Sequence, residues 1–127
     1  MNTDQPIADP KKGILLTDMV DMEWIKSITP RFYNDYIKFV VDFDLEHLYV
    51  GMDFHADCVP GEIDPAERDM RFRGGNLFFD DGHIVYESTL NIQGNLALGG
   101  TFDDVRIVSD VETVERINAI LNKWVVL

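Results

Sequence analysis

Hydrophobic and polar side chains alternate along two stretches in the first half of the chain. In the range 36–45 an apolar residue occupies every second position, and the range 47–55 repeats this pattern. A period of two with many β-branched and aromatic residues is typical of strands that bury one face. The two ranges therefore predict a β-hairpin with Phe43 opposite Leu48. The connecting turn around Glu46 lacks the glycine or asparagine that a tight two-residue turn prefers.

A second hairpin is predicted by the Asp-Gly pair at 81–82, which separates two further apolar ranges, 76–80 and 83–92. Asp-Gly favours a two-residue turn, because both central positions of that turn need a positive φ. Such a turn places Phe79 opposite Ile84. The better core face of this hairpin carries six apolar side chains: Leu77, Phe79, Ile84, Tyr86, Leu90 and Ile92.

Two short helices are predicted from their starting residues. Asp18 or Asp21 can cap a helix over 22–29, because an aspartate side chain accepts a hydrogen bond from the first free backbone N–H groups. Asp64 stands before a proline, which suits the first turn of a helix over 65–70. We expect the glycine pair that follows to end this second helix.

The last helix has the strongest pattern in the chain. Residues 109–112 form a capping box, in which a serine and a glutamate satisfy the first backbone N–H groups. Seven apolar residues then recur at helical spacing: Val111, Val114, Ile117, Ile120, Leu121, Trp124 and Val125. This stripe predicts a helix with one face against the core.

Two hairpins followed by an amphipathic helix favour an α+β fold with an antiparallel sheet of four or five strands. We expect the helices to pack on one face of the sheet and solvent to reach the other. Short apolar runs at 13–17 and 105–108 are the candidates for the remaining strands. The length fits a single domain over residues 13–127, after a polar, disordered tail over residues 1–12.

The charge and composition of the chain limit the classes of partner that we expect it to bind. The formal net charge of -12 at pH 7 repels nucleic-acid phosphates and anionic membranes, so neither is an expected partner. No apolar run approaches the roughly 20 residues that a membrane span needs. The single cysteine, Cys58, cannot form an intrachain disulfide, which favours a reducing compartment. We therefore expect an acidic, cytoplasmic protein.

Potential metal ligands gather at the end of the first hairpin, where Asp53, His55 and Asp57 alternate. If the strand continues that far, these side chains share one face and can hold a divalent metal. A metal-dependent hydrolase would then use His55 as general base, with Asp57 or Glu87 to orient it. The alternative is a polar strand end, in which Asp57 caps the next turn and Asp53 pairs with Lys38.

The solvent side of the predicted sheet also carries an aromatic and apolar patch. Its members are Tyr36, Tyr49, Phe78 and Val85, with Val40 between them. Patches of this kind mark interfaces, so a homodimer contact here competes with a site for a small ligand or another protein. A third arrangement covers the patch with the segment 59–73. We interpret the protein as a binding or interaction domain, with the hydrolase as the alternative.

The chain resembles a small prokaryotic family that is known only as a domain of unknown function. The resemblance spans about residues 17–127 and rests on a Val-Val-Asp strand, a His-Ala-Asp strand end and an Asn-Ile segment before Gly-Asn. The Arg-Pro that follows Asn-Ile in the family is absent here. The matching positions are Asp42, His55, Asp57, Asn76, Ser88, Asn91, Gly94 and Asn95. The family brings no activity, but the resemblance implies that His55, Asp57, Asn76 and Asn91 converge, with Asn76 and Asn91 as ligand-binding residues.

Overall fold

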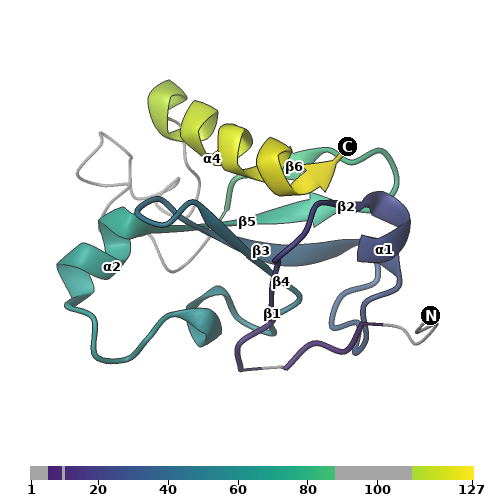
Figure 1. Ribbon diagram of the computed structural model, residues 1–127, viewed down its shortest axis with the longest axis horizontal. Helices are drawn as coiled ribbons and strands as arrows, with labels where there is room; N and C mark the ends of the chain where they lie inside the picture. The colour runs from purple at the N-terminus through teal and green to yellow at the C-terminus, as the bar shows by residue number, and fades with distance from the viewer. Residues whose placement is uncertain (1–5, 10, 88–109) are drawn as a thin grey trace.

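The computed structural model describes residues 6–9, 11–87 and 110–127 (Figure 1). A five-stranded sheet has the order β1-β4-β3-β5-β6, and all of its neighbouring strands are antiparallel. Its strands are β1 (Ile14–Leu15), β3 (Tyr36–Asp42), β4 (His47–Val50), β5 (Phe72–Phe78) and β6 (Ile84–Val85). A separate parallel pair joins β2 (Val20–Asp21) to β7 (Val125–Val126). The helices are α1 (Met22–Lys26), η1 (His55–Cys58, a 3-10 helix), α2 (Pro65–Arg71) and α4 (Val111–Trp124). The predicted α+β fold with an antiparallel sheet is confirmed.

The predicted caps Asp21 and Asp64 are confirmed by hydrogen bonds, whereas the last helix is capped by Asp110 and not by the predicted Ser109, which lies outside the described residues. The carboxylate of Asp21 accepts from the backbone N–H of Trp24, Asp64 accepts from Ala66, and Asp110 accepts from Thr113, each at 2.9 Å. Within the described residues, no helix is long and apolar enough to cross a membrane. The predicted strand at 105–108 lies outside the described residues.

Both predicted hairpins form, but each pairs its strands two residues away from the predicted register. Val41 lies opposite Leu48, and Leu77 lies opposite Ile84. The loops are therefore four residues long, 43–46 and 79–82, instead of two. The side-chain faces stay as predicted, because a shift by an even number preserves the alternation.

Each four-residue loop ends on a residue with a positive φ, Glu46 at 53° and Gly82 at 75°. In the first loop the carboxylate of Asp42 accepts hydrogen bonds from the N–H groups of Asp44 and Leu45, at 2.9 and 3.3 Å. A side chain that binds the loop backbone in this way stabilises a longer turn and removes the need for a glycine pair.

The main core lies between the sheet and α4, which runs along one face of it (Figure 1). Ile117, Ile120 and Leu121 of the predicted helical stripe are buried there, whereas Val111 is 70% exposed. Helix α1 adds Ile25 to the same cluster. The backbone of residues 6–9 also joins this structure, because Ala8 is buried and its N–H donates to the carbonyl of Thr29.

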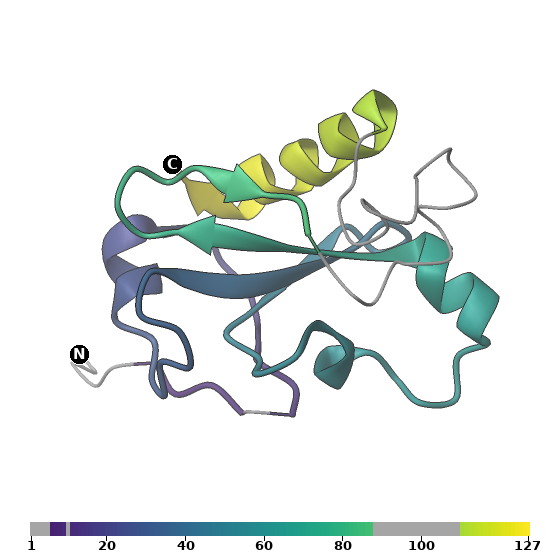
Figure 2. The same ribbon diagram turned by 180° about the vertical axis from the view of Figure 1, so that it is seen from behind.

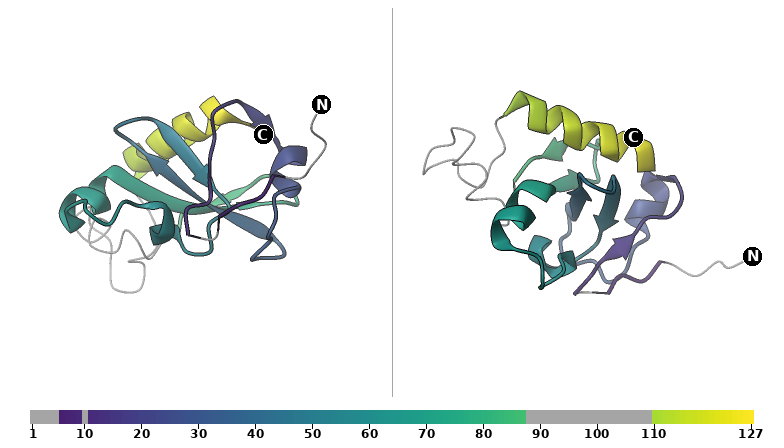
Figure 3. Two further views of the ribbon diagram at one scale, coloured as in Figure 1. Left: turned by 60° about the horizontal axis from the view of Figure 1, so that its bottom comes forward. Right: turned by 60° about the vertical axis from the view of Figure 1, so that its left-hand side comes forward.

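The opposite face of the sheet is partly covered as well, so the prediction that the helices pack on one face is wrong. Val40, Met52 and Phe72 form a second buried cluster on this side. Cys58, Val59 and Ile63 pack against them, and α2 lies on the side of the sheet away from α4 (Figure 3). This arrangement agrees in part with the third alternative, because the cluster takes in Val40 and Tyr49 of the patch.

Strand β5 starts directly after α2 and runs through Gly74 and Gly75, which the sequence pattern assigned to the end of the helix. Gly75 lies opposite Phe39 on β3. A Cβ atom at this position would lie 2.5 Å from Cζ of Phe39, so the aromatic ring occupies the space that a side chain would need. The glycine therefore belongs inside the strand, because a neighbouring ring packs over its backbone.

Candidate functional site

The strand that was predicted to carry Asp53, His55 and Asp57 ends earlier, at Val50. The chain then turns at Gly51, which has a φ of 85°, and His55 begins the 3-10 helix η1. The three side chains therefore do not alternate along one strand face. The geometric premise of the predicted metal site is wrong.

His55 anchors η1 to the sheet. Its side chain is buried, and Nε2 lies 2.9 Å from the carbonyl oxygen of Gly75. A carbonyl oxygen can only accept, so Nε2 carries the proton and donates it. Burial lowers the pKa of His55 to about 4; the hydrogen bond to Gly75 opposes this shift and the charge of Lys38 adds to it. The ring is therefore neutral at pH 7, and its Nε2–H group forms a structural hydrogen bond with strand β5.

The other two members of the predicted site have separate roles. Asp57 accepts a hydrogen bond from the backbone N–H of Phe54 at 3.0 Å, so its carboxylate closes the first turn of η1. The backbone carbonyl of Asp53 accepts from the hydroxyl of Tyr33 at 2.9 Å. Lys38, the expected partner of Asp53, meets Gly51 on that side of β3, since its carbonyl accepts from the N–H of Gly51 at 3.0 Å. The ammonium group of Lys38 lies 4.8 Å from the ring centre of Tyr33.

The thiol of Cys58 lies at the end of η1, 3.6 Å from the carbonyl oxygen of His55. Burial raises the pKa of this thiol to about 12, so the reactive thiolate is not formed near neutral pH. The cysteine is thus a half-buried apolar group rather than a nucleophile paired with the histidine.

The convergence that the family resemblance implies is visible only in part. Asn76 follows Gly75, the residue that His55 contacts, and its Oδ1 atom is buried with no hydrogen-bond partner among the described residues. Glu87 is half-buried just after β6. Asn91 lies outside the described residues, as do the matching positions from 88 to 95.

Asp42, another position of the resemblance, is part of an ion pair that holds two elements together. It is 1% exposed and accepts two hydrogen bonds from the guanidinium of Arg71, at 2.9 and 2.8 Å. Burial raises the pKa of Asp42, but the hydrogen bonds from Arg71, Leu45 and Asp44 outweigh that effect and keep the pKa below its usual value. The pair joins the β3–β4 turn to the end of α2, which is a structural role.

Four aromatic rings lie in a row across one end of the sheet, and we call this row the ring ladder: Tyr33, Tyr36, Phe78 and His83. Neighbouring ring centres lie 4.7, 5.1 and 4.3 Å apart in that order; the first and last pairs are stacked and the middle pair is tilted. Tyr36 and Phe78 face each other across β3 and β5. The last two rings belong to the β5–β6 hairpin (Figure 2). His83 reaches Phe78 because the N–H of Phe78 donates to the carbonyl of His83 where this hairpin closes.

The predicted interface patch is thus divided between two places. Tyr36 and Phe78 come together in the ring ladder. Val85 lies on the neighbouring strand β6, opposite Asn76 of β5. Tyr49 is on the other half of the face, where it packs against the second buried cluster, of which Val40 is a member. The ladder is half-buried up to its last ring, His83, which is exposed.

A groove of about 470 Å³ opens beside the exposed end of the ladder. This volume lies in the range of small-ligand sites, roughly 300–1,000 Å³. The groove combines ring surface with polar and charged groups from four segments of the chain. Its lining residues are Lys26, Asn34, Asp35, Phe78, Phe79, Asp80 and His83.

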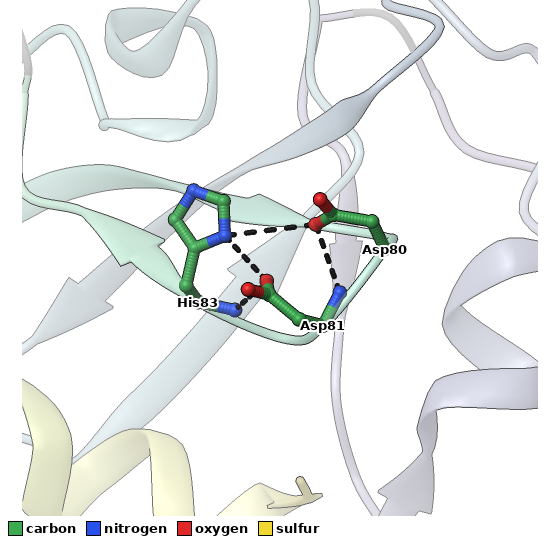
Figure 4. Close-up of side chains that lie close together, drawn as sticks. All are labelled: Asp80, Asp81 and His83. Atoms are coloured by element: carbon green, nitrogen blue, oxygen red, sulfur yellow. Dashed lines mark hydrogen bonds and ion pairs between the residues drawn. The ribbon is translucent and has the colours of Figure 1, made fainter.

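Asp80, Asp81 and His83 gather at the turn that borders this groove (Figure 4). One potential metal-ligand atom from each lies within 4.8 Å of the others, and all three residues are exposed. The turn itself accounts for the arrangement. Asp81 accepts from the backbone N–H and the ring of His83, and Asp80 accepts from the N–H of Asp81. The hydrogen bond from the His83 backbone, followed by that from its ring, lowers the pKa of Asp81 to about 2.

Sequence reasoning missed the roles of Tyr33, Asp80 and His83, although the chain contains a signal for them. The pattern Phe-Asp-x-x-His occurs at 43–47 and again at 79–83, and both copies form the four-residue loops. A four-residue loop at 79–82 places residues 78 and 83 opposite each other. The repeated pattern could therefore have predicted the contact between His83 and Phe78.

Comparison with known proteins gives one match. A family model described as "Protein of unknown function (DUF5674)" matches residues 14–124. No curated protein and no solved structure matches the chain. The match confirms the resemblance to a domain family of unknown function, and it assigns no ligand or activity.

Proposed function

The chain belongs to the family described as Protein of unknown function (DUF5674), and we propose that it acts as a binding domain through the ring ladder and the adjoining groove. One observation carries the proposal: the ladder ends on an exposed ring, His83, that borders a groove with hydrogen-bonding side chains. Ligand sites commonly combine aromatic surface with a few polar groups in this way.

The packing of the ladder supports a binding role. Tyr33 and Tyr36 lie nearly parallel, at 14°, as do Phe78 and His83, at 15°. Rings that are already stacked lose little further freedom when a ligand binds, so they present a pre-organised surface. On the outer face Cys58, Val59 and Ile63 pack against the second buried cluster, and the four rings of the ladder do not belong to that cluster.

The experiment is a screen of small aromatic and charged fragments against 15N-labelled protein, followed by amide chemical shifts. We expect hits to shift the amides of residues 78–83 and to lose binding in His83→Ala. Leu45→Ala is the matched control, because Leu45 is an exposed side chain in the other four-residue hairpin loop. A screen whose hits all bind elsewhere, or bind His83→Ala unchanged, would overturn the proposal.

A metal-dependent hydrolase centred on Asp53, His55 and Asp57 is the alternative, and it stays a prediction. It has less support, because His55 is hydrogen-bonded to Gly75 and the Asp57 carboxylate is used in the cap of η1. Metal analysis of protein purified without a histidine tag tests it. Stoichiometric metal that is lost in His55→Ala but kept in His83→Ala would favour the hydrolase over the binding domain.

A further inference from the structure

We infer that the groove binds the guanidinium group of an arginine side chain on a basic protein partner. This inference rests on the proposed function, because it names the kind of partner that the same site would take. It follows from the charges around the groove, from the way the rings nearby already hold cations, and from the shape of the guanidinium group.

Two carboxylates, Asp35 and Asp80, line the groove, and Asp81 lies beside Asp80 on the turn that borders it. Within the part of the chain that the structure describes, the ion pairs of Asp80 and Asp81 are with His83 alone, and Asp35 has none. His83 is neutral in the formal charge count, which gives the whole chain -12 at pH 7. An acidic protein attracts cations at long range, and the carboxylates give such a cation a local partner.

Several aromatic rings in this region already have a cationic side chain over one face. The ammonium of Lys38 lies 4.8 Å from the ring centre of Tyr33 and 5.4 Å from that of Phe54. The guanidinium of Arg31 lies 4.7 Å from the ring centre of Phe79. A cation over an aromatic face is attracted by the negative charge of the ring surface. The exposed end of the ladder is the imidazole ring of His83, a flat surface beside the Asp80 carboxylate on which a planar guanidinium can stack.

Arginine fits this combination better than lysine. Its guanidinium is planar, so it can stack on a ring while two N–H groups donate to one carboxylate. An ammonium group is a point charge that is more strongly hydrated and cannot stack. Lys26 also lines the groove and opposes an incoming cation, so it offsets one of the carboxylates. Removing the charge of Lys26 should therefore strengthen the binding of a cation in the groove.

The probe is the peptide acetyl-Gly-Arg-Gly-Arg-Gly-amide, titrated into 15N-labelled protein, with peptides that carry lysine or glutamate instead of arginine for comparison. We expect the arginine peptide to bind most tightly and to shift the amides around Phe78 and His83. Asp35→Asn combined with Asp80→Asn should weaken its binding about tenfold, because the carboxylates that accept charge-assisted hydrogen bonds from the guanidinium become neutral amides. Lys26→Gln should tighten it, because a repelling charge is removed.

The matched control is Glu112→Gln combined with Glu115→Gln, which changes the net charge equally on the exposed side of α4. Equal weakening in the control pair would show a general attraction to the acidic surface and would overturn the inference. Preference for the glutamate peptide, or weaker binding in Lys26→Gln, would also overturn it. If fragments bind the groove but the arginine peptide does not, the inference fails and the proposed function stands. If neither binds there, both fail.

Discussion

The buried histidine of η1 makes the stability of the fold depend on pH. The pKa of His55 is about 4 in the folded protein, against its ordinary 6.5, because burial disfavours the charged ring. Between these two values the unfolded chain binds the proton more readily than the folded chain. The stability that the neutral ring contributes is therefore fully present above pH 6.5 and is lost as the pH falls toward 4.

The size of this effect follows from the difference between the two pKa values. Each unit corresponds to about 1.4 kcal/mol, so the whole shift amounts to about 3 kcal/mol of unfolding free energy. About 2 kcal/mol of it should already be lost at pH 5. Such a loss is large compared with the total stability of a small domain, about 5–15 kcal/mol.

The assay is urea unfolding of the wild-type chain and of His55→Gln at several pH values between 7 and 4.5. Glutamine keeps an N–H donor for the Gly75 carbonyl but does not titrate, so the difference between the two proteins isolates the histidine. We expect the wild type to lose about 2 kcal/mol relative to the variant by pH 5. A difference that stays constant within about 0.5 kcal/mol would refute the reasoning, as would an NMR titration that gives His55 an ordinary pKa.

Three further predictions concern the strand glycine and the turn between β3 and β4, each checked by urea unfolding at pH 7. Gly75→Ala should destabilise the fold by about 1–3 kcal/mol, because the new Cβ meets the ring of Phe39. Gly61→Ala is the control and should be close to neutral, because a Cβ there has nothing within 4 Å. Equal effects of the two substitutions would contradict this account. Asp42→Ala should cost about 2 kcal/mol, because it leaves the partly exposed guanidinium of Arg71 and two loop N–H groups without their acceptor. A loss below about 1 kcal/mol would argue against the ion pair. Glu46→Gly should stabilise by up to about 1 kcal/mol, since its φ of 53° suits glycine, and a destabilised variant would count against that assignment.

The candidate site illustrates the limits of local patterns. Tyr36 and Phe78 were assigned to one surface from strand alternation, and the structure brings their rings into tilted contact. Alternation also placed Asp53, His55 and Asp57 together, but it assumed that the strand continued. The chain leaves the sheet after Val50, at Gly51, whose φ of 85° suits glycine. A glycine within a strand pattern is a local signal of a bend, but the alternation that continues through Phe54 hid it.

The sequence by itself determined which hairpin residues face the main core, where α1 and α2 begin and how acidic the chain is. These features depend on chemistry between residues close together in the chain, such as an aspartate that caps the next turn. The tertiary structure decided the hairpin registers, the cover on the second face and the role of His55. The ring of His55 contacts a carbonyl 20 positions away, and Asp42 meets Arg71 across 29 positions. Contacts between residues so far apart in the sequence exist only after the sheet has formed. For this reason His55, predicted as a metal ligand, instead holds η1 against the sheet.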